Sequence, residues 1–300
     1  MEFPLNGISV GLDCSKGDVS FLSHAHGDHT GGLKRKETLI SSEETLALGA
    51  LSAQPHSGNG FSLLDAGHIL GSRQFFAEAD GSSFLYSGDF RLKDGIFGKG
   101  AELREADHLV VECTYGSPGF RFPDPFEVYD QISKWVSSNN DSILLMGAYN
   151  LGKAQEVIRV LNKYSSITPV VTPEAEHFNK VYEKFGHKLD RAVVGTEEAE
   201  EIMRGGFIAV VPTRLARRSF ASRLSSAFGR RVLTAAVTGW VLSHRVNADA
   251  RFPLSDHSDF HDIISYVEAV NPRKIDFVHG EGALLGKELR RRGVCPNNNI

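Results

Sequence analysis

Long apolar runs and paired cysteines are both missing from this sequence of 300 residues. No run approaches the roughly 18 apolar residues of a membrane-spanning helix, which argues against a membrane protein of the helical type. Residues 1–4 lack the basic start and the apolar core of a signal peptide, so we expect a cytoplasmic protein with no membrane partner. Cys14, Cys113 and Cys295 form no CxxC pair, which argues against disulfides and against a cysteine zinc site. We expect them to be small buried residues.

An overall surplus of positive charge is missing too, because the formal net charge is -4. Any surface for a polyanion must therefore come from local clustering. Residues 202–248 contain no aspartate or glutamate, and the arginines there are Arg204, Arg214, Arg217, Arg218, Arg223, Arg230, Arg231 and Arg245. Arginine binds phosphate oxygens without reading bases, so we expect this segment, including Arg217 and Arg218, to contact a nucleic-acid backbone. A solvated helix face over residues 215–228 is the alternative.

Short apolar runs broken by glycine, serine and aspartate fill the sequence up to about residue 115. We predict strands there at residues 8–10, 19–22, 61–64, 74–77, 84–86 and 109–111, and a helix at 43–51. After the proline-rich residues 117–125, a helix (126–137), a strand (142–146), a helix (153–164) and a strand (168–171) alternate as in a parallel α/β unit. From residue 251 on, the pattern predicts a helix (259–270), a strand (274–278) and a helix (283–292). The sequence therefore predicts an α/β protein whose outer domain, residues 1–119 and 249–300, is interrupted by an inserted α/β domain, residues 120–248.

Three histidines and an aspartate follow the apolar run 19–22, in the stretch SHAHGDHTGG. Imidazole and carboxylate are the usual ligands of zinc and similar divalent metals. His24 and His26 alternate in an extended segment and can face one ion, whereas Asp28 and His29, displaced by a bend, can face a second. A coincidental polar loop is the alternative, and the density of ligand types argues against it.

Four ligands are too few for two ions, so the others should lie on other strand ends. The candidates are His68, Asp89 and His279, each of which follows an apolar run or lies in a glycine-flanked turn. A rigid strand can present a side chain at an open edge in such places. Taken singly, each would be an ordinary hydrogen-bonded or turn residue, but together with the histidine cluster they are candidate metal ligands.

Residues 147–154, GAYNLGKA, nearly fit the P-loop pattern GxxxxGK[ST]. The last position is alanine, so the hydroxyl that binds magnesium in P-loop proteins is absent, and we do not expect hydrolysis of nucleoside triphosphates. The amide groups of a helix start together with Lys153 would still suit a phosphate. A tight strand-to-helix turn without a ligand is the alternative.

SHAHGDHTGG, the isolated His68, the GDF around Asp89 and the late His279 resemble the motifs of the metallo-β-lactamase fold, an αββα sandwich with a two-zinc site on its edge. Glu112 in VVECTYG, His257 in LSDHSDF and His279 in VHGE are similar to the three motifs of the β-CASP nucleases, and the resemblance covers nearly the whole chain.

Within that family, GSPGFRFP (116–123), GAYNLGKAQ (147–155) and TGW (238–240) look most like the bacterial and archaeal DNA exonucleases that are associated with DNA ligase. The chain is also similar to the Artemis-like repair nucleases. Those relatives typically lack the third-motif histidine, which is present here as His279, so equivalence to them does not follow.

The resemblance implies a role for each site residue. His24, His26 and His68 would hold one Zn²⁺, and Asp28, His29 and His279 the second, with Asp89 bridging both; Mn²⁺ is an open alternative. His257 would give a proton to the leaving oxygen, with Glu112 orienting its ring, so that Asp28, Glu112 and His257 form the catalytic set. Tyr149, Lys153, Thr238 and Ser243 would hold a terminal 5′ phosphate.

These expectations describe a two-zinc nuclease, in the first place a 5′-to-3′ exonuclease that acts on single-stranded DNA in DNA repair. The second reading is an RNA-processing 5′-exo/endoribonuclease of the ribonuclease J type. A small-molecule hydrolase of the lactamase type would not need Glu112, His257 or the arginine segment, and a binding subunit without activity would not keep every ligand position. A homodimer and a functional link to DNA ligase stay open.

Overall fold

The structure is a computed structural model, and it describes residues 1–5, 7–33, 36–55, 60–79 and 81–294. The chain divides into two compact units. Unit 1 comprises Met1–Asp94, Gly98–Arg121 and Asp256–Ile300, and unit 2 comprises Gly95–Phe97 and Phe122–Ser255. Of the cysteines expected to be buried, Cys113 is 1% exposed, Cys14 is half-buried, and Cys295 lies outside the described residues.

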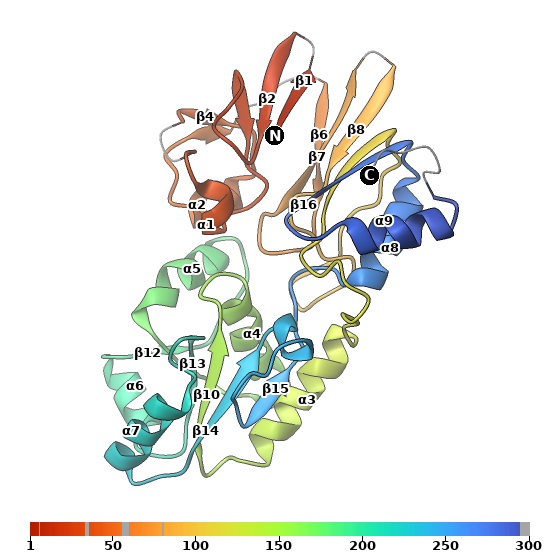
Figure 1. The fold of residues 1–300 in the computed structure, drawn as a ribbon. Helices are drawn as coiled ribbons and strands as arrows, with labels where there is room; N and C mark the ends of the chain where they lie inside the picture. The colour runs from red at the N-terminus through yellow and green to blue at the C-terminus, as the bar shows by residue number, and fades with distance from the viewer. Residues whose placement is uncertain (6, 34–35, 56–59, 80, 295–300) are drawn as a thin grey trace. The chain divides into compact units, whose positions relative to one another are not determined.

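Unit 1 is built on two β-sheets and a short strand pair (Figure 1). The three-stranded sheet has the order β1-β2-β3 and contains β1 (Glu2–Leu5), β2 (Ile8–Leu12) and β3 (Val19–Phe21). The five-stranded sheet has the order β16-β9-β8-β7-β6 and contains β6 (Phe61–Asp65), β7 (Arg73–Ala79), β8 (Ser82–Tyr86), β9 (His108–Glu112) and β16 (Lys274–Val278). The pair is β4 (Thr38–Leu39) and β5 (Gln54–Pro55). Because β16 comes from the end of the chain and pairs with β9, the five-stranded sheet is completed only by residues that follow unit 2.

The side chains of β8 show how the layers of unit 1 pack. Phe84 and Tyr86 belong to the core between the two sheets, where the Phe84 ring stacks on Phe3 with centroids 3.9 Å apart. Leu85 belongs to a second core with residues of the C-terminal helices, such as Ile263. Successive side chains of a strand point to opposite faces, so this alternation places a sheet on one side of β8 and helices on the other.

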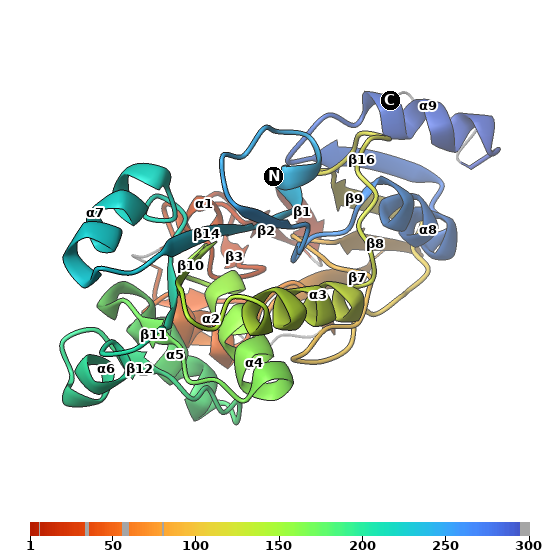
Figure 2. The same ribbon diagram turned by 90° about the horizontal axis from the view of Figure 1, so that it is seen from below.

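The helices of unit 1 are α1 (Gly27–Thr30), α2 (Glu43–Leu48), α8 (Phe260–Val270) and α9 (Ala283–Arg291). Figures 1 and 2 show α8 and α9 beside the five-stranded sheet. Helix α8 begins where the Asp259 carboxylate accepts hydrogen bonds from the main-chain amides of His261 and Asp262, which satisfies two amides of its first turn.

Unit 2 contains a six-stranded sheet in which every pairing is parallel. Its order is β12-β11-β13-β10-β14-β15, with β10 (Ile143–Ala148), β11 (Val170–Val171), β12 (Ala192–Val193), β13 (Ile208–Pro212), β14 (Val232–Val237) and β15 (Ala250–Phe252). The strands that follow β10 in the sequence, β11 to β13, lie on one side of it within the sheet, and β14 and β15 lie on the other side. Strands β13, β10 and β14 are therefore neighbours. Their carboxyl ends form the kind of edge at which open α/β sheets bind ligands.

The helices of unit 2 are α3 (Pro125–Ser137), α4 (Lys153–Ser165), α5 (Pro173–Lys184), α6 (Glu197–Ile202), α7 (Arg218–Phe228) and the short 3-10 helix η1 (Gly239–Leu242). Helix α3 starts with Asp124 as its N-cap and Pro125 in its first turn. It runs beside α4 (Figure 2), with the rings of Tyr129 and Tyr164 5.7 Å apart.

The α/β class predicted from the sequence is confirmed, and the long helices predicted at 126–137, 153–164, 259–270 and 283–292 are α3, α4, α8 and α9. Two predictions ran too long by two residues or more. Helix α2 ends at Leu48 because Gly49 follows it, and the strand predicted at 168–171 is only Val170–Val171. Among the described residues, no helix is long and apolar enough to cross a membrane.

Candidate metal centre

The SHAHGDHTGG stretch leaves β3 and enters the one-turn helix α1, entirely within unit 1. His24 is fully buried and His29 is 2% exposed, whereas the Asp28 side chain is 78% exposed. The extended backbone up to His26 and the turn that follows therefore send the ligand candidates in different directions, as the bend at Gly27 predicts.

Three ring nitrogens from two segments meet at one point. His24 Nε2 lies 3.1 Å from His26 Nδ1, and His68 Nε2 lies 3.1 Å from the same atom. Asp89 Oδ2 lies 3.4 Å from His24 Nε2 and 3.9 Å from His68 Nε2. Each of the four residues offers a ligand atom within 4.8 Å of the others. The structure thus brings together the three histidines predicted for the first ion and the aspartate predicted to bridge.

The Nδ1 atoms of His24 and His68 point away from the cluster, and each makes a hydrogen bond that fixes the tautomer of its ring. His68 Nδ1 donates to the Asp256 carbonyl at 2.8 Å, because a carbonyl can only accept. Ser23 Oγ donates to Asp13 Oδ2 at 2.6 Å, so it accepts from His24 Nδ1 at 2.9 Å. The Nε2 atoms of His24 and His68 therefore carry lone pairs toward His26, which is the form of imidazole that binds a metal.

The four residues are arranged to bind a cation and cannot satisfy one another by hydrogen bonds alone. A single ring proton on His26 Nδ1 cannot serve two facing lone pairs, and Asp89 Oδ1 is buried without a hydrogen-bond partner among the described residues. An unpartnered buried carboxylate oxygen is costly unless a cation or a donor reaches it. Three imidazoles and a carboxylate are ligands that zinc prefers.

The electrostatics of the cluster agree with this fit. Burial lowers the pKa of His24 and of His68 well below the usual 6.5, so both rings are neutral near pH 7. Burial would raise the pKa of Asp89, but the imidazoles around it, His24 first, hold that pKa well below its usual value. Burial would lower the pKa of His29, but the hydrogen-bonded carboxylates of Asp13 and Asp89 raise it to about 11. The surroundings of Asp89 thus favour positive charge, whether a proton or a metal ion carries it.

The residues predicted for a second ion are placed more openly. His29 Nε2 lies 3.5 Å from Asp89 Oδ2 and 3.9 Å from Asp28 Oδ2. The rings of His29 and His279 are 4.8 Å apart, and His279 follows β16 with a left-handed backbone, φ +56°. Asp28, His29 and His279 therefore lie around one region next to Asp89, and the second ion stays a prediction.

Asp13 is a residue that the sequence analysis missed. It follows β2 with φ +47°, and its side chain is 5% exposed. Its carboxylate accepts hydrogen bonds from His29 Nδ1 at 2.7 Å, from Tyr86 Oη at 2.9 Å and from Ser23, through which it also supports His24. The only sequence signal was an aspartate directly after an apolar run, a pattern that is also typical of turns.

We expect Asp13→Asn to lower metal affinity about 10- to 100-fold, as loss of a partner behind the metal ligands typically does. The amide would keep one acceptor but would turn a donor toward His29 or Ser23. Zinc titration of the metal-stripped protein measures the effect, with Asp18→Asn, an exposed neighbour that accepts from the Ser9 amide, as the control. Equal affinities in the two variants would contradict a role of Asp13 at the centre.

Glu112 and His257 form a pair beside the cluster. Glu112 ends β9, is 0% exposed, and accepts hydrogen bonds from the amides of Phe90 at 3.3 Å and Thr114 at 2.9 Å. His257 Nδ1 donates to Glu112 Oε1 at 2.8 Å, and its Nε2 lies 4.0 Å from Asp89 Oδ2. Burial would lower the pKa of His257, but the carboxylates of Glu112 and Asp89 raise it to about 9. The imidazole therefore carries a proton on Nε2 near neutral pH.

The residues predicted to bind a phosphate lie in unit 2, where Tyr149 follows β10 and is 54% exposed. Lys153 begins α4 but is only 2% exposed, and its ammonium donates to Glu156 Oε2 at 2.7 Å. Glu156 also accepts from Tyr129 Oη at 2.6 Å. A phosphate contact by Lys153 would require the ammonium to leave this pair, so it stays a prediction.

The remaining predicted phosphate ligands follow the neighbouring strands. Thr238 Oγ1 accepts from the Trp240 amide at 3.4 Å and caps η1 after β14. Ser243 ends η1 and is exposed, and Arg217 and Arg218 are exposed at the start of α7, after β13. The structure therefore places this set at the carboxyl edge formed by β13, β10 and β14.

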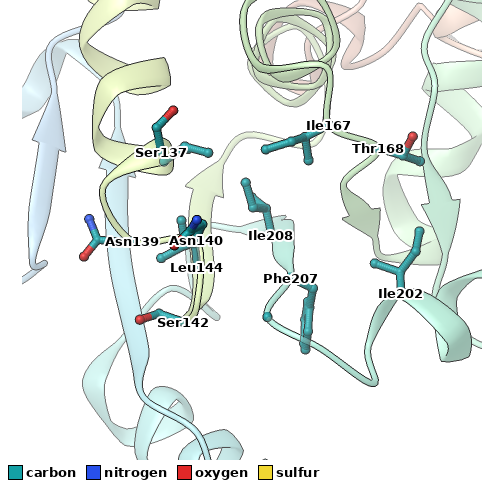
Figure 3. Close-up of a pocket in the computed structure, with 12 residues that line it drawn as sticks. Ser137, Asn139, Asn140, Ser142, Leu144, Ile167, Thr168, Ile202, Phe207 and Ile208 are labelled. Atoms are coloured by element: carbon teal, nitrogen blue, oxygen red, sulfur yellow. The ribbon is translucent and has the colours of Figure 1, made fainter.

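A cavity of about 330 Å³ lies elsewhere in unit 2. It is lined by residues near the amino ends of β10 and β13, such as Leu144 and Ile208, and by the α4–β11 connection with Ile167 (Figure 3). None of the predicted site residues lines it. This cavity is thus separate from the phosphate-binding edge predicted from the sequence.

Comparison with known proteins agrees with the motif assignments. Residues 243–287 match the family described as "Zn-dependent metallo-hydrolase RNA specificity domain". A probable DNA ligase of Opitutus terrae is 32% identical over 92% of this chain and 28% of its own length. An RNase J-like protein of Methanocaldococcus jannaschii is 32% identical over 35% of this chain and 26% of its own length. The chain thus spans little more than a quarter of either relative.

A crystal structure of a protein of unknown function from Enterococcus faecalis V583 matches 89% of this chain and 76% of its own, with a TM-score of 0.60 and 13% identity. That likeness concerns the fold alone. The mixed α/β fold and the clustered histidines are consistent with the metallo-β-lactamase class. The chain belongs to the β-CASP metallo-β-lactamase nuclease family.

Proposed function

We propose that this chain is a two-zinc-dependent nuclease that hydrolyses phosphodiester bonds, and that its substrate is single-stranded DNA degraded from the 5′ end during DNA repair. The observation that carries the proposal is the cluster of His24, His26, His68 and Asp89 beside the Glu112–His257 pair. A small-molecule lactamase would need the metal ligands but not this second pair.

The proposed roles follow from the geometry. His24, His26 and His68 would hold one ion, and Asp28, His29 and His279 the other, with Asp89 between them. Bound zinc would supply Lewis-acid polarisation of a phosphoryl oxygen and would lower the pKa of a water molecule toward neutrality. Manganese is the alternative metal, and metal analysis of the purified protein distinguishes the two.

His257 would act as the general acid. Its Nδ1 is bound to Glu112, so Nε2–H is the proton that can be given to the leaving 3′ oxygen. The raised pKa keeps that proton in place near pH 7, and Glu112 stabilises the ring in the orientation that presents it.

We further propose that unit 1 is the αββα sandwich and that unit 2, close to residues 120–248, is the inserted β-CASP domain. Arg217 and Arg218 would contact the substrate backbone, and Tyr149, Lys153, Thr238 and Ser243 a terminal phosphate. The name of the ligase relative, whose match covers most of this chain, supports DNA and a functional link to DNA ligase. A homodimer and a cytoplasmic location stay predictions.

The second candidate is an RNA-processing enzyme of the ribonuclease J type. The description of the matched family as an RNA specificity domain favours it, as does the name of the RNase J-like relative. Its catalytic residues would be the same, so the metal centre does not separate the two functions.

Digestion of matched single-stranded DNA and RNA, labelled at either end and carrying a 5′ phosphate or a 5′ hydroxyl, tests both functions. Chelator-sensitive release of mononucleotides from 5′-phosphorylated DNA, with RNA spared, is the expected result. Preferential cutting of RNA would establish the second candidate, and cutting of neither would overturn the proposal.

The role of Lys153 needs a variant that leaves no unpaired buried charge. We expect Lys153→Met combined with Glu156→Gln to fold, because replacing both partners of a buried ion pair is often neutral for stability. If Lys153 binds the terminal phosphate, this variant loses the preference for 5′-phosphorylated over 5′-hydroxyl strands by about tenfold, the value of one charge-assisted hydrogen bond. An unchanged preference would assign Lys153 to the core of unit 2.

A further inference from the structure

The turn between β10 and α4 is closed by a side chain that the sequence analysis did not consider. Gly152 has φ +83° and ψ -72°, a backbone conformation that favours glycine. The Gly152 amide donates to Gln155 Oε1 at 2.8 Å, and Gln155 Nε2 donates to the Asn150 carbonyl at 3.0 Å. One side chain thus binds both sides of the turn.

Gln155 is itself fixed from the other side. Its Nε2 also donates to Asn179 Oδ1 at 2.7 Å, so both amide hydrogens are used. Gln155 and Asn179 are each 0% exposed. A flip of the Gln155 amide would turn its NH₂ group toward the Gly152 amide, so only one orientation satisfies all three partners.

The orientation is set by a half-buried ion pair between Glu176, in the first turn of α5, and Arg191, which follows this helix. Asn179 Nδ2 donates to Glu176 Oε2 at 3.4 Å, and a carboxylate can only accept, so Asn179 must present its oxygen to Gln155. Arg191 binds both oxygens of Glu176, at 2.9 and 2.8 Å, and the Arg191 side chain is 8% exposed. Hydrogen-bond donation therefore runs from the Gly152 amide through Gln155 and Asn179 to Glu176, which also accepts from Arg191.

The turn that this relay fixes lies at the carboxyl edge of the sheet. It presents Tyr149 to solvent. The strand that leads into the turn, β10, is packed against the β13–α7 connection, because a Cβ atom on Gly147 would come within 2.6 Å of the Ala216 Cβ.

We propose that Gln155 is a positioning residue that holds the Tyr149–Gly152 turn in the shape that binds the terminal 5′ phosphate of a nucleic acid strand. This inference rests on the proposed function and names the device behind its phosphate-binding edge. Gln155 does not touch the substrate; it acts through the main chain of Asn150 and Gly152. Glu156 pairs with the Lys153 ammonium, so the shape of the turn contributes to the preference for a phosphate whether or not Lys153 leaves that pair.

Gln155→Glu tests the inference because the isosteric carboxylate still accepts from the Gly152 amide but faces the Asn150 and Asn179 oxygens without a hydrogen to donate. Asn162→Asp is the matched control. It lies in the same helix, and Asn162 likewise donates to two carbonyls, those of Ile167 and Asp190, but away from the turn. Glu176→Gln is a milder variant that keeps an acceptor for Asn179 while weakening the hold of Arg191.

Binding of one oligothymidylate with a 5′ phosphate or a 5′ hydroxyl is measured by fluorescence anisotropy in a His257→Ala background, so that the strands stay intact. The parent should prefer the 5′ phosphate. Gln155→Glu should reduce that preference about tenfold, which corresponds to the loss of one or two hydrogen bonds, while Asn162→Asp keeps it. Glu176→Gln should fall between them and decides the matter if Gln155→Glu does not fold.

An unchanged preference in Gln155→Glu and Glu176→Gln, an equal loss in Asn162→Asp, or a parent without preference would each overturn the inference. Cutting assays on the wild-type chain test the proposed function separately. If the preference for a 5′ phosphate depends on Gln155 but the wild-type chain cuts no strand, this inference holds and the proposed nuclease function is wrong.

Discussion

Replacing His257 with alanine is expected to lower the turnover of single-stranded DNA about 10²- to 10⁴-fold while the metal content stays near two ions per chain. The loss is that of a general acid whose Nε2 proton no longer reaches the leaving oxygen. The metal content should survive because His257 Nδ1 is bound to the Glu112 carboxylate, at 2.8 Å, and His257 is not one of the predicted metal ligands. Initial rates and metal analysis on the same preparation measure both.

His261→Ala is the matched control. His261 is an exposed histidine at the start of α8, four residues after His257 in the sequence, and it is not one of the predicted site residues. It should retain full activity. A His257→Ala protein that loses metal together with activity would show that His257 is a metal ligand. Asp89, Glu112 and His257 would then be the residues that hold this ion, because their ligand atoms also lie within 4.8 Å of one another.

Asp89→Asn is expected to abolish metal binding at the centre and to lower activity at least about a thousandfold, because bound metal supplies several kcal/mol of transition-state stabilisation. Asp89 Oδ2 is the atom that lies within 3.4 to 4.0 Å of His24, His29, His68 and His257. An amide would remove the negative charge from this group and would offer hydrogens to nitrogens that should bind metal.

Zinc titration followed by thermal unfolding checks this expectation. Zinc should raise the unfolding midpoint of the metal-stripped wild type, because a ligand that binds only the folded state stabilises it, and it should leave Asp89→Asn unchanged. Asp94→Asn, which loses only an exposed pair with Lys99, should respond like the wild type. A zinc response in Asp89→Asn equal to that of the wild type would remove Asp89 from the centre.

The metal cluster could be foreseen from the sequence because its chemistry is local in one segment. Three histidines and an aspartate within six residues, with a glycine bend among them, predict where His24 and His29 can point without knowledge of the fold. His68, Asp89 and His257 were different. Each is an ordinary residue by itself. His68 and Asp89 were candidates only through their places after an apolar run or in a glycine-flanked turn, and His257 was connected to them only by the resemblance to β-CASP motifs.

Residues that support the site only through hydrogen bonds to other residues could not be predicted from the sequence. Asp13 reads as a turn residue and Gln155 as one more polar position in a helix, because a hydrogen-bond partner leaves no pattern of its own in the chain. Lys153 is the converse case, and its phosphate contact stays a prediction. A lysine at a helix start suggests an open charge, but the structure pairs it with Glu156, one turn later and equally buried.

The position of β16 at the edge of the five-stranded sheet has a consequence for biosynthesis. Strands β6 to β9 and the first histidines leave the ribosome early, but His257, β16 and His279 are made only after all of unit 2. A growing chain that already carries six of the seven predicted metal ligands therefore has neither the proposed general acid, His257, nor β16, the strand that precedes the last histidine. On the proposed roles, the catalytic site is therefore incomplete until residues 257–279 have been made.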